Sequence, residues 1–111
     1  MEYQVKLTDY AIGQIQESVT YISKVLLVPD VAHRWATRIE EDISSLKRMP
    51  GRYPLTPEEP WHSEGIHKMP TGNFLVYYWI DDAKSIVWIT AVVYGRRDQL
   101  HALRSMPNDK R

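Results

Sequence analysis

The 111-residue sequence contains no cysteine, which excludes disulfides and thiolate metal sites. This absence fits a reducing compartment, and we expect a cytoplasmic protein. No apolar run is long enough to span a bilayer, and residues 1–4 do not form the start of a signal peptide. The sequence therefore predicts a soluble protein with no membrane partner.

The sequence also lacks net charge, because 14 lysines and arginines balance 14 aspartates and glutamates. The charge is unevenly placed, however. Residues 1–46 hold four basic and seven acidic residues, whereas residues 47–111 hold ten basic and seven acidic residues. The second part could steer a polyanion, but its charge is far weaker than that of a dedicated nucleic-acid-binding domain.

Motifs for cofactor chemistry are missing as well. There is no glycine-rich phosphate loop and no serine-centred elbow. His62 and His67 lie five residues apart without a carboxylate cluster, which is a poor pattern for zinc. We expect neither a metal nor a cofactor.

Hydrophobic periodicity predicts two helices between strands. Residues 3–7 alternate as a half-buried strand, and apolar residues then recur at three- and four-residue steps over 9–26 and 29–48. Strands are predicted at 65–69, 74–80 and 86–94, followed by a short helix at 99–106 and a tail at 107–111. Residues 1–111 thus read as one α+β domain, in which an antiparallel helix hairpin packs on one face of a mostly antiparallel four-stranded sheet.

The two last strands are apolar on both faces. Simple alternation places Val87, Ile89, Ala91 and Val93 together on one face of the last strand. Because the helix pair can cover only one face of the sheet, the other face needs a cover. Either the proline-rich loop with Tyr53 and Trp61 folds over it together with the terminal helix, or it is a partner-binding surface.

Candidate chemistry gathers around the end of the last strand. Arg96 and Arg97 follow that strand directly, and Tyr94 is its last residue. His67 and Lys68 lie in the predicted strand 65–69 and, with His101, add proton donors and acceptors. These residue types suit metal-free cleavage of RNA, in which one group accepts a proton, another donates one and cations stabilise the phosphorane. Pure binding remains the alternative.

Several segments together resemble the RelE/ParE superfamily of bacterial type II toxins. They are the first strand with its following residue (Tyr3-x-Val-x-Leu-Thr8), the end of the predicted second helix (Leu46-x-x-x-Pro50), the strand segment 75–81 (LVYYWID) and the segment after the last strand (Tyr94-Gly-Arg-Arg-Asp98). The resemblance covers residues 3 to about 103. It implies a cognate antitoxin that covers the β-hairpin of the strands 74–80 and 86–94 together with the arginine rim (Arg96 and Arg97), and a role such as plasmid stabilisation.

The superfamily resemblance implies two activities, which are ribosome-dependent mRNA cleavage in RelE-like members and inhibition of DNA gyrase in ParE-like members. Arg97 falls where RelE-like enzymes keep an arginine, whereas their strand arginine aligns with Phe74 and their terminal-helix tyrosine falls on or near Leu103. Tyr94 replaces a common histidine. From the sequence we favour an mRNA endoribonuclease that inhibits translation, with Arg97 and Arg96 for phosphate, His67 or Lys68 for proton transfer or charge stabilisation, and Tyr94 for orientation. The alternatives are a gyrase inhibitor and an inactive antitoxin-binding member.

Overall fold

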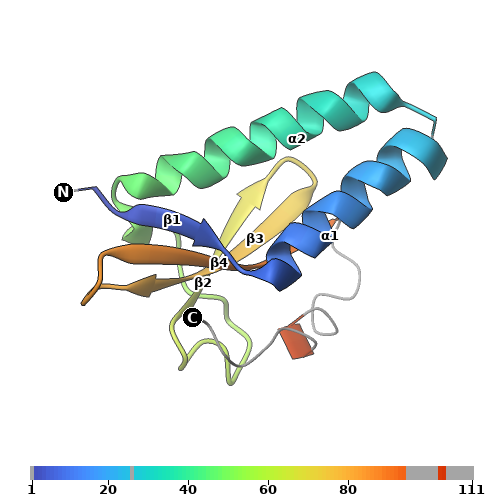
Figure 1. Ribbon diagram of the computed structural model, residues 1–111. Coiled ribbons are helices and arrows are strands. Elements are labelled where there is room, and N and C mark those ends of the chain that lie inside the picture. Colours follow the sequence, from blue (N-terminus) through green and yellow to red (C-terminus); the bar gives the residue numbers. More distant parts are fainter. Residues whose placement is uncertain (1, 26, 95–102, 105–111) are drawn as a thin grey trace.

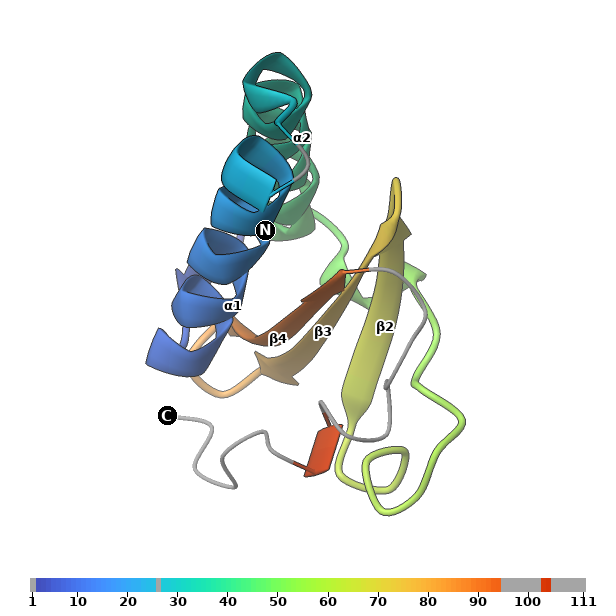
Figure 2. The same ribbon diagram turned by 90° about the vertical axis from the view of Figure 1, so that its right-hand side faces the viewer.

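The fold is one mixed sheet with two helices on one face (Figure 1). A computed structural model of the chain describes residues 2–25, 27–94, 103 and 104. The strands are β1 (Gln4–Leu7), β2 (Ile66–Thr71), β3 (Phe74–Asp81) and β4 (Ile86–Tyr94). They lie in the order β1-β4-β3-β2, with β1 parallel to β4 and the other pairs antiparallel. Figure 2 shows α1 (Asp9–Thr20) and α2 (Pro29–Ser44) together on one side of this sheet, which confirms the predicted α+β class.

The first helix begins as the sequence predicts and ends differently. The Thr8 hydroxyl accepts a hydrogen bond from the Ala11 N–H at 3.2 Å, which is the N-cap bond expected of this residue. A π-helical turn then spans Tyr21–Val25, and Leu27 adopts the left-handed conformation at φ 57°. These two irregularities reverse the chain, so that α2 can start at Pro29 and run back along α1.

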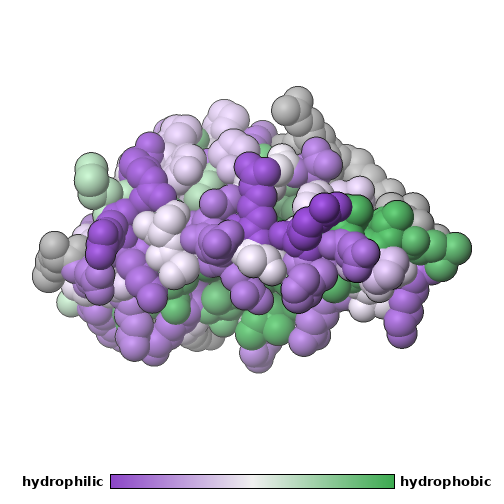
Figure 3. Space-filling view, turned by 90° about the horizontal axis from the view of Figure 1, so that it is seen from above, coloured by the Kyte–Doolittle hydropathy of each residue, from purple (hydrophilic) through white to green (hydrophobic). Residues whose placement is uncertain are grey.

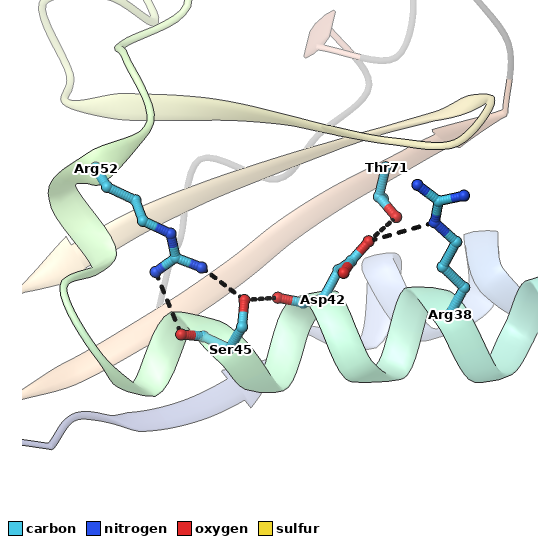
Figure 4. A network of polar contacts seen from close by, with 5 residues as sticks. All are labelled: Arg38, Asp42, Ser45, Arg52 and Thr71. Atoms are coloured by element: carbon cyan, nitrogen blue, oxygen red, sulfur yellow. Dashed lines mark hydrogen bonds and ion pairs between the residues drawn. The ribbon is translucent and has the colours of Figure 1, made fainter.

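A side chain closes the carboxyl end of α2. Nη1 of Arg52 donates hydrogen bonds to the carbonyl oxygens of Arg48 at 2.6 Å and Met49 at 3.3 Å, and to that of Ser45 at 3.3 Å, which Figure 4 draws. Its Nη2 donates to the Ser45 hydroxyl oxygen at 2.6 Å. The guanidinium thus joins the turns that follow α2, where the Ser45 and Met49 carbonyls also accept from the backbone N–H groups of Arg48 and Arg52.

A second polar contact ties α2 to the sheet. The Thr71 hydroxyl at the end of β2 donates a hydrogen bond to Asp42 Oδ2, and Arg38 Nε lies 3.8 Å from the same oxygen (Figure 4). The Arg38 side chain is largely exposed, so the Thr71 bond is the stronger of these two polar contacts, and it adds to the apolar packing between α2 and Met69 of β2.

A β-bulge changes which residues of β4 face the helices. Tyr77 pairs with Ala91 and Tyr78 with Ile89, so Thr90 is the extra residue, and its hydroxyl donates to the Tyr77 carbonyl at 3.2 Å. As a result Val87, Ile89 and Val92 pack beneath the helices, whereas Ala91 and Val93 pack on the opposite face. The expectation that Val87, Ile89, Ala91 and Val93 share one face is therefore wrong.

The sheet face turned away from the helices is covered by other parts of the chain. Trp61 of the proline-rich loop and Leu103 pack there, and the buried residues of this cluster are Ile66, Leu75, Tyr77, Ala91, Val93 and Leu103. Of the two alternatives left by the sequence, the structure thus shows a cover from the chain itself. Tyr53 instead packs against the helix-side core. Of the predicted terminal helix, only Leu103 and Arg104 lie within the described residues, and both are helical.

Candidate functional site

A small polar cluster lies on the sheet face turned away from the helices. The Thr56 hydroxyl donates a hydrogen bond to Glu58 Oε1; this bond, with a smaller contribution from Lys68, lowers the pKa of the Glu58 carboxyl. Burial and the nearby Glu58 raise the pKa of Tyr77, the β3 partner of Lys68, to about 12. At neutral pH the cluster therefore holds an ionised carboxylate and a neutral phenol beside Lys68. Sequence reasoning missed Glu58 because nothing in its loop marks a carboxylate that faces the sheet.

His67 lies on the opposite face from Lys68. Its ring stacks on Tyr78 of the helix-side core, with centroids 4.9 Å apart and planes at 11°. Its Nδ1 lies 2.7 Å from the Tyr53 carbonyl oxygen, which can only accept, so we assign the proton to Nδ1. Consecutive strand residues point to opposite faces, and the structure therefore separates the two groups predicted for proton transfer.

Tyr94 is held in an aromatic cluster at the end of β4. Its ring centroid lies 4.9 Å from Trp35 in an edge-to-face arrangement, 5.4 Å from Phe74 and 6.5 Å from Tyr21. Phe74 is 1% exposed and lies only 3.7 Å from Trp35 between ring centroids. The position that the RelE resemblance associates with an arginine is thus part of the core under α2.

The sequence-predicted residues do not all meet at one point. In β2, His67 precedes Thr71 by four residues, which corresponds to about 13 Å along a strand. Thr71 is the strand neighbour of Phe74, and Phe74 is that of Tyr94. Tyr94 lies at the end of the sheet, whereas His67 lies beside the middle of β3, so the two are well separated. Arg96 and Arg97 lie outside the described residues.

A groove runs between β1 and the two helices. It has a volume of about 610 Å³, and its apolar lining comes from Val5, Leu7, Ile12, Ile15, Ala36, Ile39 and Ile43. We call it the helix–strand groove. The sequence predicted these side chains as core stripes, but it did not show that β1 would be an edge strand with a hollow beside it.

Among the described residues, no strand pairs with the outer edge of β1, which lies beside this groove. The N–H groups of Gln4 and Thr8 bond to the carbonyls of Ser85 at 2.9 Å and Ile89 at 3.0 Å on the β4 side. By strand alternation, the N–H groups of Val5 and Leu7 point the other way. An open edge beside an apolar groove can accept an extended chain segment.

A second exposed apolar surface lies where α1 and α2 meet. It consists of Tyr21, Leu27, Val28 and Val31, of which Leu27 is 77% exposed. Figure 3 shows hydrophobic surface at this end of the molecule. We call these four residues the hairpin tip.

Among the described residues, no three histidine or acidic side chains are grouped as metal ligands would be. None of the helices in the described part of the chain has the length and apolar character to cross a membrane.

The sequence matches a family model described as the ParE toxin of the type II toxin–antitoxin system parDE, over residues 5–99. This chain belongs to the ParE toxin family. It is therefore a toxin of the RelE/ParE superfamily, and an antitoxin partner is part of such a system. No curated protein sequence matches the chain significantly.

Solved structures of the superfamily share the fold. The chromosomal ParDE toxin–antitoxin system from P. aeruginosa is 16% identical with a TM-score of 0.69, and the match covers 86% of this chain and 98% of that one. The toxin–antitoxin complex RelBE2 from Mycobacterium tuberculosis is 25% identical with a TM-score of 0.59, covering 85% and 99%. A mutant of the E. coli toxin RelE in the free state is 11% identical with a TM-score of 0.60, covering 94% and 97%. The ParE toxin fold is thus shared with RelE proteins, so the fold alone leaves the cellular target open.

Proposed function

We propose that this ParE family toxin acts on DNA gyrase and is held inactive by its antitoxin. The observation that carries the proposal is the separation of His67 and Lys68 on opposite faces of β2. Metal-free RNA cleavage needs a proton acceptor, a proton donor and a cation within hydrogen-bond reach of one phosphate. A toxin that works by binding a protein needs only a rigid surface, and the family match to ParE supports this target.

Phe74 supports the same conclusion. A RelE-like enzyme uses an arginine in this strand, according to the superfamily resemblance, and a guanidinium near phosphate supplies charge-assisted hydrogen bonds. Here the aligned side chain is buried against Trp35 and cannot reach a phosphate. The chain therefore lacks one cation of the ribonuclease arrangement at that position.

Ribosome-dependent mRNA cleavage is the second candidate, because Glu58 lies near Lys68 and stays ionised. In that case the Glu58 carboxylate accepts the proton of the attacking 2′-hydroxyl, and the Lys68 ammonium donates a proton to the 5′-oxygen that leaves as the P–O5′ bond breaks. Arg96 and Arg97 then stabilise the phosphate charge. Tyr94 then orients the RNA substrate, and His67 has only a structural role in β2. This candidate needs a substrate to enter beside Trp61, which packs over the same face.

For the antitoxin we propose the helix–strand groove as the main binding site. The sequence led us to expect the antitoxin over the hairpin, but α1 and α2 cover one face of β3 and β4, and Trp61 and Leu103 pack on the other. The groove is apolar, and the outward amides of Val5 and Leu7 can pair with an extended antitoxin segment. Antitoxin contact with Arg96 and Arg97 remains a prediction.

The antitoxin site is tested with Ile12→Glu, which places a charge on a 40% exposed side chain of the groove. We expect at least a tenfold loss of affinity for the product of the neighbouring antitoxin reading frame, measured by calorimetry. Met49→Glu is the matched control, because Met49 is 75% exposed and outside the groove. Equal affinity of the two variants would place the antitoxin elsewhere.

The target is tested by inducing the toxin without antitoxin in growing bacteria. We expect DNA replication to stop first, with a DNA-damage response, while mRNA stays intact. The variants Glu58→Gln and Lys68→Met should then stay toxic. Early cleavage of mRNA that both variants abolish would replace gyrase with the ribosome as target. No toxicity of the folded wild type in either assay would indicate an inactive antitoxin-binding member.

A further inference from the structure

The hairpin tip and the helix–strand groove are two apolar surfaces at different places on the same helix pair. The tip is the turn between α1 and α2. The groove lies against the first turns of α1 and the last turns of α2. Ile39 of the groove follows Val28 of the tip by eleven residues, which is about 16 Å along a helix. The tip of one molecule therefore cannot fill its own groove.

The sizes of the two surfaces suit insertion of the hairpin tip into the helix–strand groove. Four side chains expose an apolar area on the order of a few hundred Å², which is below the roughly 800 Å² per partner of a stable flat interface. The groove volume of about 610 Å³ lies within the usual range of pockets that take apolar ligands. A protruding tip that enters a groove buries surface on all its sides, so the small area of the hairpin tip is sufficient for a weak contact.

Charges around the two surfaces are complementary. Lys6, Lys47 and Glu40 line the groove beside its apolar residues. Exposed Lys24 precedes the tip residue Leu27, and exposed Asp30 lies between Val28 and Val31. The Lys6 ammonium lies over the Trp88 ring, so Asp30 of an entering tip can face Lys47 while Lys24 faces Glu40, which disfavours the reverse orientation.

We propose that free toxin associates head to tail, with the hairpin tip of one molecule in the helix–strand groove of the next. Such a contact joins two different surfaces, so it does not close at a dimer and the assembly grows with concentration. The proposal is independent of the cellular target. It makes the antitoxin a competitor for the groove, so that antitoxin binding dissociates the assembly.

Sedimentation velocity and light scattering of the purified full-length toxin test this contact. We expect the average mass to rise past that of a dimer between concentrations on the order of 10 µM and 1 mM. Leu27→Asp places a charge on the hairpin tip and so disrupts its apolar surface. Aspartate tolerates the left-handed backbone of this residue. Ile12→Glu places a charge in the apolar lining of the groove. Met49→Asp is the control, because Met49 is a similarly exposed residue with a left-handed backbone that lies outside both surfaces. Circular dichroism confirms that each variant is folded.

The decisive sample is a mixture of the two interface variants. Leu27→Asp and Ile12→Glu should each be monomeric alone, whereas their equimolar mixture should form a dimer and stop there. This follows because the intact groove of one variant accepts the intact tip of the other, and the remaining tip and groove are both damaged. Met49→Asp should associate as the wild type does.

Three results would overturn the proposal. They are a wild type that stays monomeric over the whole range, a single interface variant that still associates, and a mixture that stays monomeric. Association of Ile12→Glu alone would indicate a tip-to-tip contact, and association of Leu27→Asp alone would indicate pairing through β1. None of these outcomes changes the result expected in the gyrase assay. The proposal on the cellular target and the proposal on self-association can therefore be refuted separately.

Discussion

His67 and Lys68 are neighbours in β2 and point to opposite faces of the sheet. The His67 ring stacks on Tyr78 in the core beneath the helices, whereas Lys68 lies near Glu58 on the other face. This relationship decides between two roles for the histidine. We infer that His67 joins the loop at Tyr53 to the sheet and takes no part in proton transfer.

His67→Ala should therefore lower stability without lowering intrinsic toxicity. The variant loses the 2.7 Å bond to the Tyr53 carbonyl and the stacking on Tyr78, which together stabilise the fold by about 1–2 kcal/mol. Urea unfolding measures the loss, and His67→Phe should recover part of it by keeping the stacking. A toxin of normal stability that is inactive after His67→Phe would assign the imidazole a functional role.

Phe74→Arg should not create a ribonuclease. Phe74 is 1% exposed and packs against Trp35, so a guanidinium there is buried without a partner, and the free energy of unfolding should fall by more than about 3 kcal/mol. Thermal unfolding measures the destabilisation, and Phe74→Leu provides the conservative comparison, with a smaller loss. A folded Phe74→Arg variant that cuts mRNA would show that this position faces the substrate.

Arg52→Met should loosen the carboxyl end of α2. The guanidinium donates to the carbonyls of Ser45, Arg48 and Met49, and we expect its removal to cost about 1 kcal/mol. Arg48→Met is the matched control, because the Arg48 side chain is 83% exposed and its ion pair with Glu2 lies on the surface. If both variants unfold at the same urea concentration, the capping role of Arg52 is refuted.

Two tyrosines should make the fold sensitive to alkali. Burial raises the pKa of Tyr77 and of Tyr78 to about 12 from the ordinary 10.0. The unfolded chain loses these protons near pH 10 while the folded chain keeps them, so this contribution to stability is complete below pH 10 and is lost as pH rises toward 12. Phenolate absorbance should show late titration of these groups in the folded protein, and Tyr77→Phe should remove one of them. Titration of every tyrosine in one step near pH 10 would contradict the burial.

The sequence predicts the helices and the last strand well because local signals determine them. The Thr8 cap and the apolar stripes position α1 and α2, and the predicted strand at 86–94 has the bounds of β4. The bulge at Thr90 could not be predicted, because a strand with apolar residues on both faces gives no signal for a shift of register. That shift depends on the pairing of Tyr77 and Tyr78 with β4.

The candidate site was harder to predict than the fold. His67 and Lys68 share a segment of sequence, and only the pairing with Tyr78 and Tyr77 shows which face each residue joins. Glu58 faces the sheet because the loop before β2 folds back, with the Thr56 N–H bonded to the Ile66 carbonyl at 2.8 Å. Contacts of this kind are tertiary and leave no periodic pattern.

The central claim is that the toxin acts on gyrase, and a supercoiling assay with purified gyrase and relaxed plasmid tests it most directly. We predict that the toxin inhibits supercoiling and leaves cleaved plasmid when gyrase is trapped with detergent, and that prior addition of the antitoxin abolishes both effects. A reconstituted translation reaction at the same toxin concentration should keep its mRNA intact. Unchanged supercoiling together with cut mRNA would contradict the account.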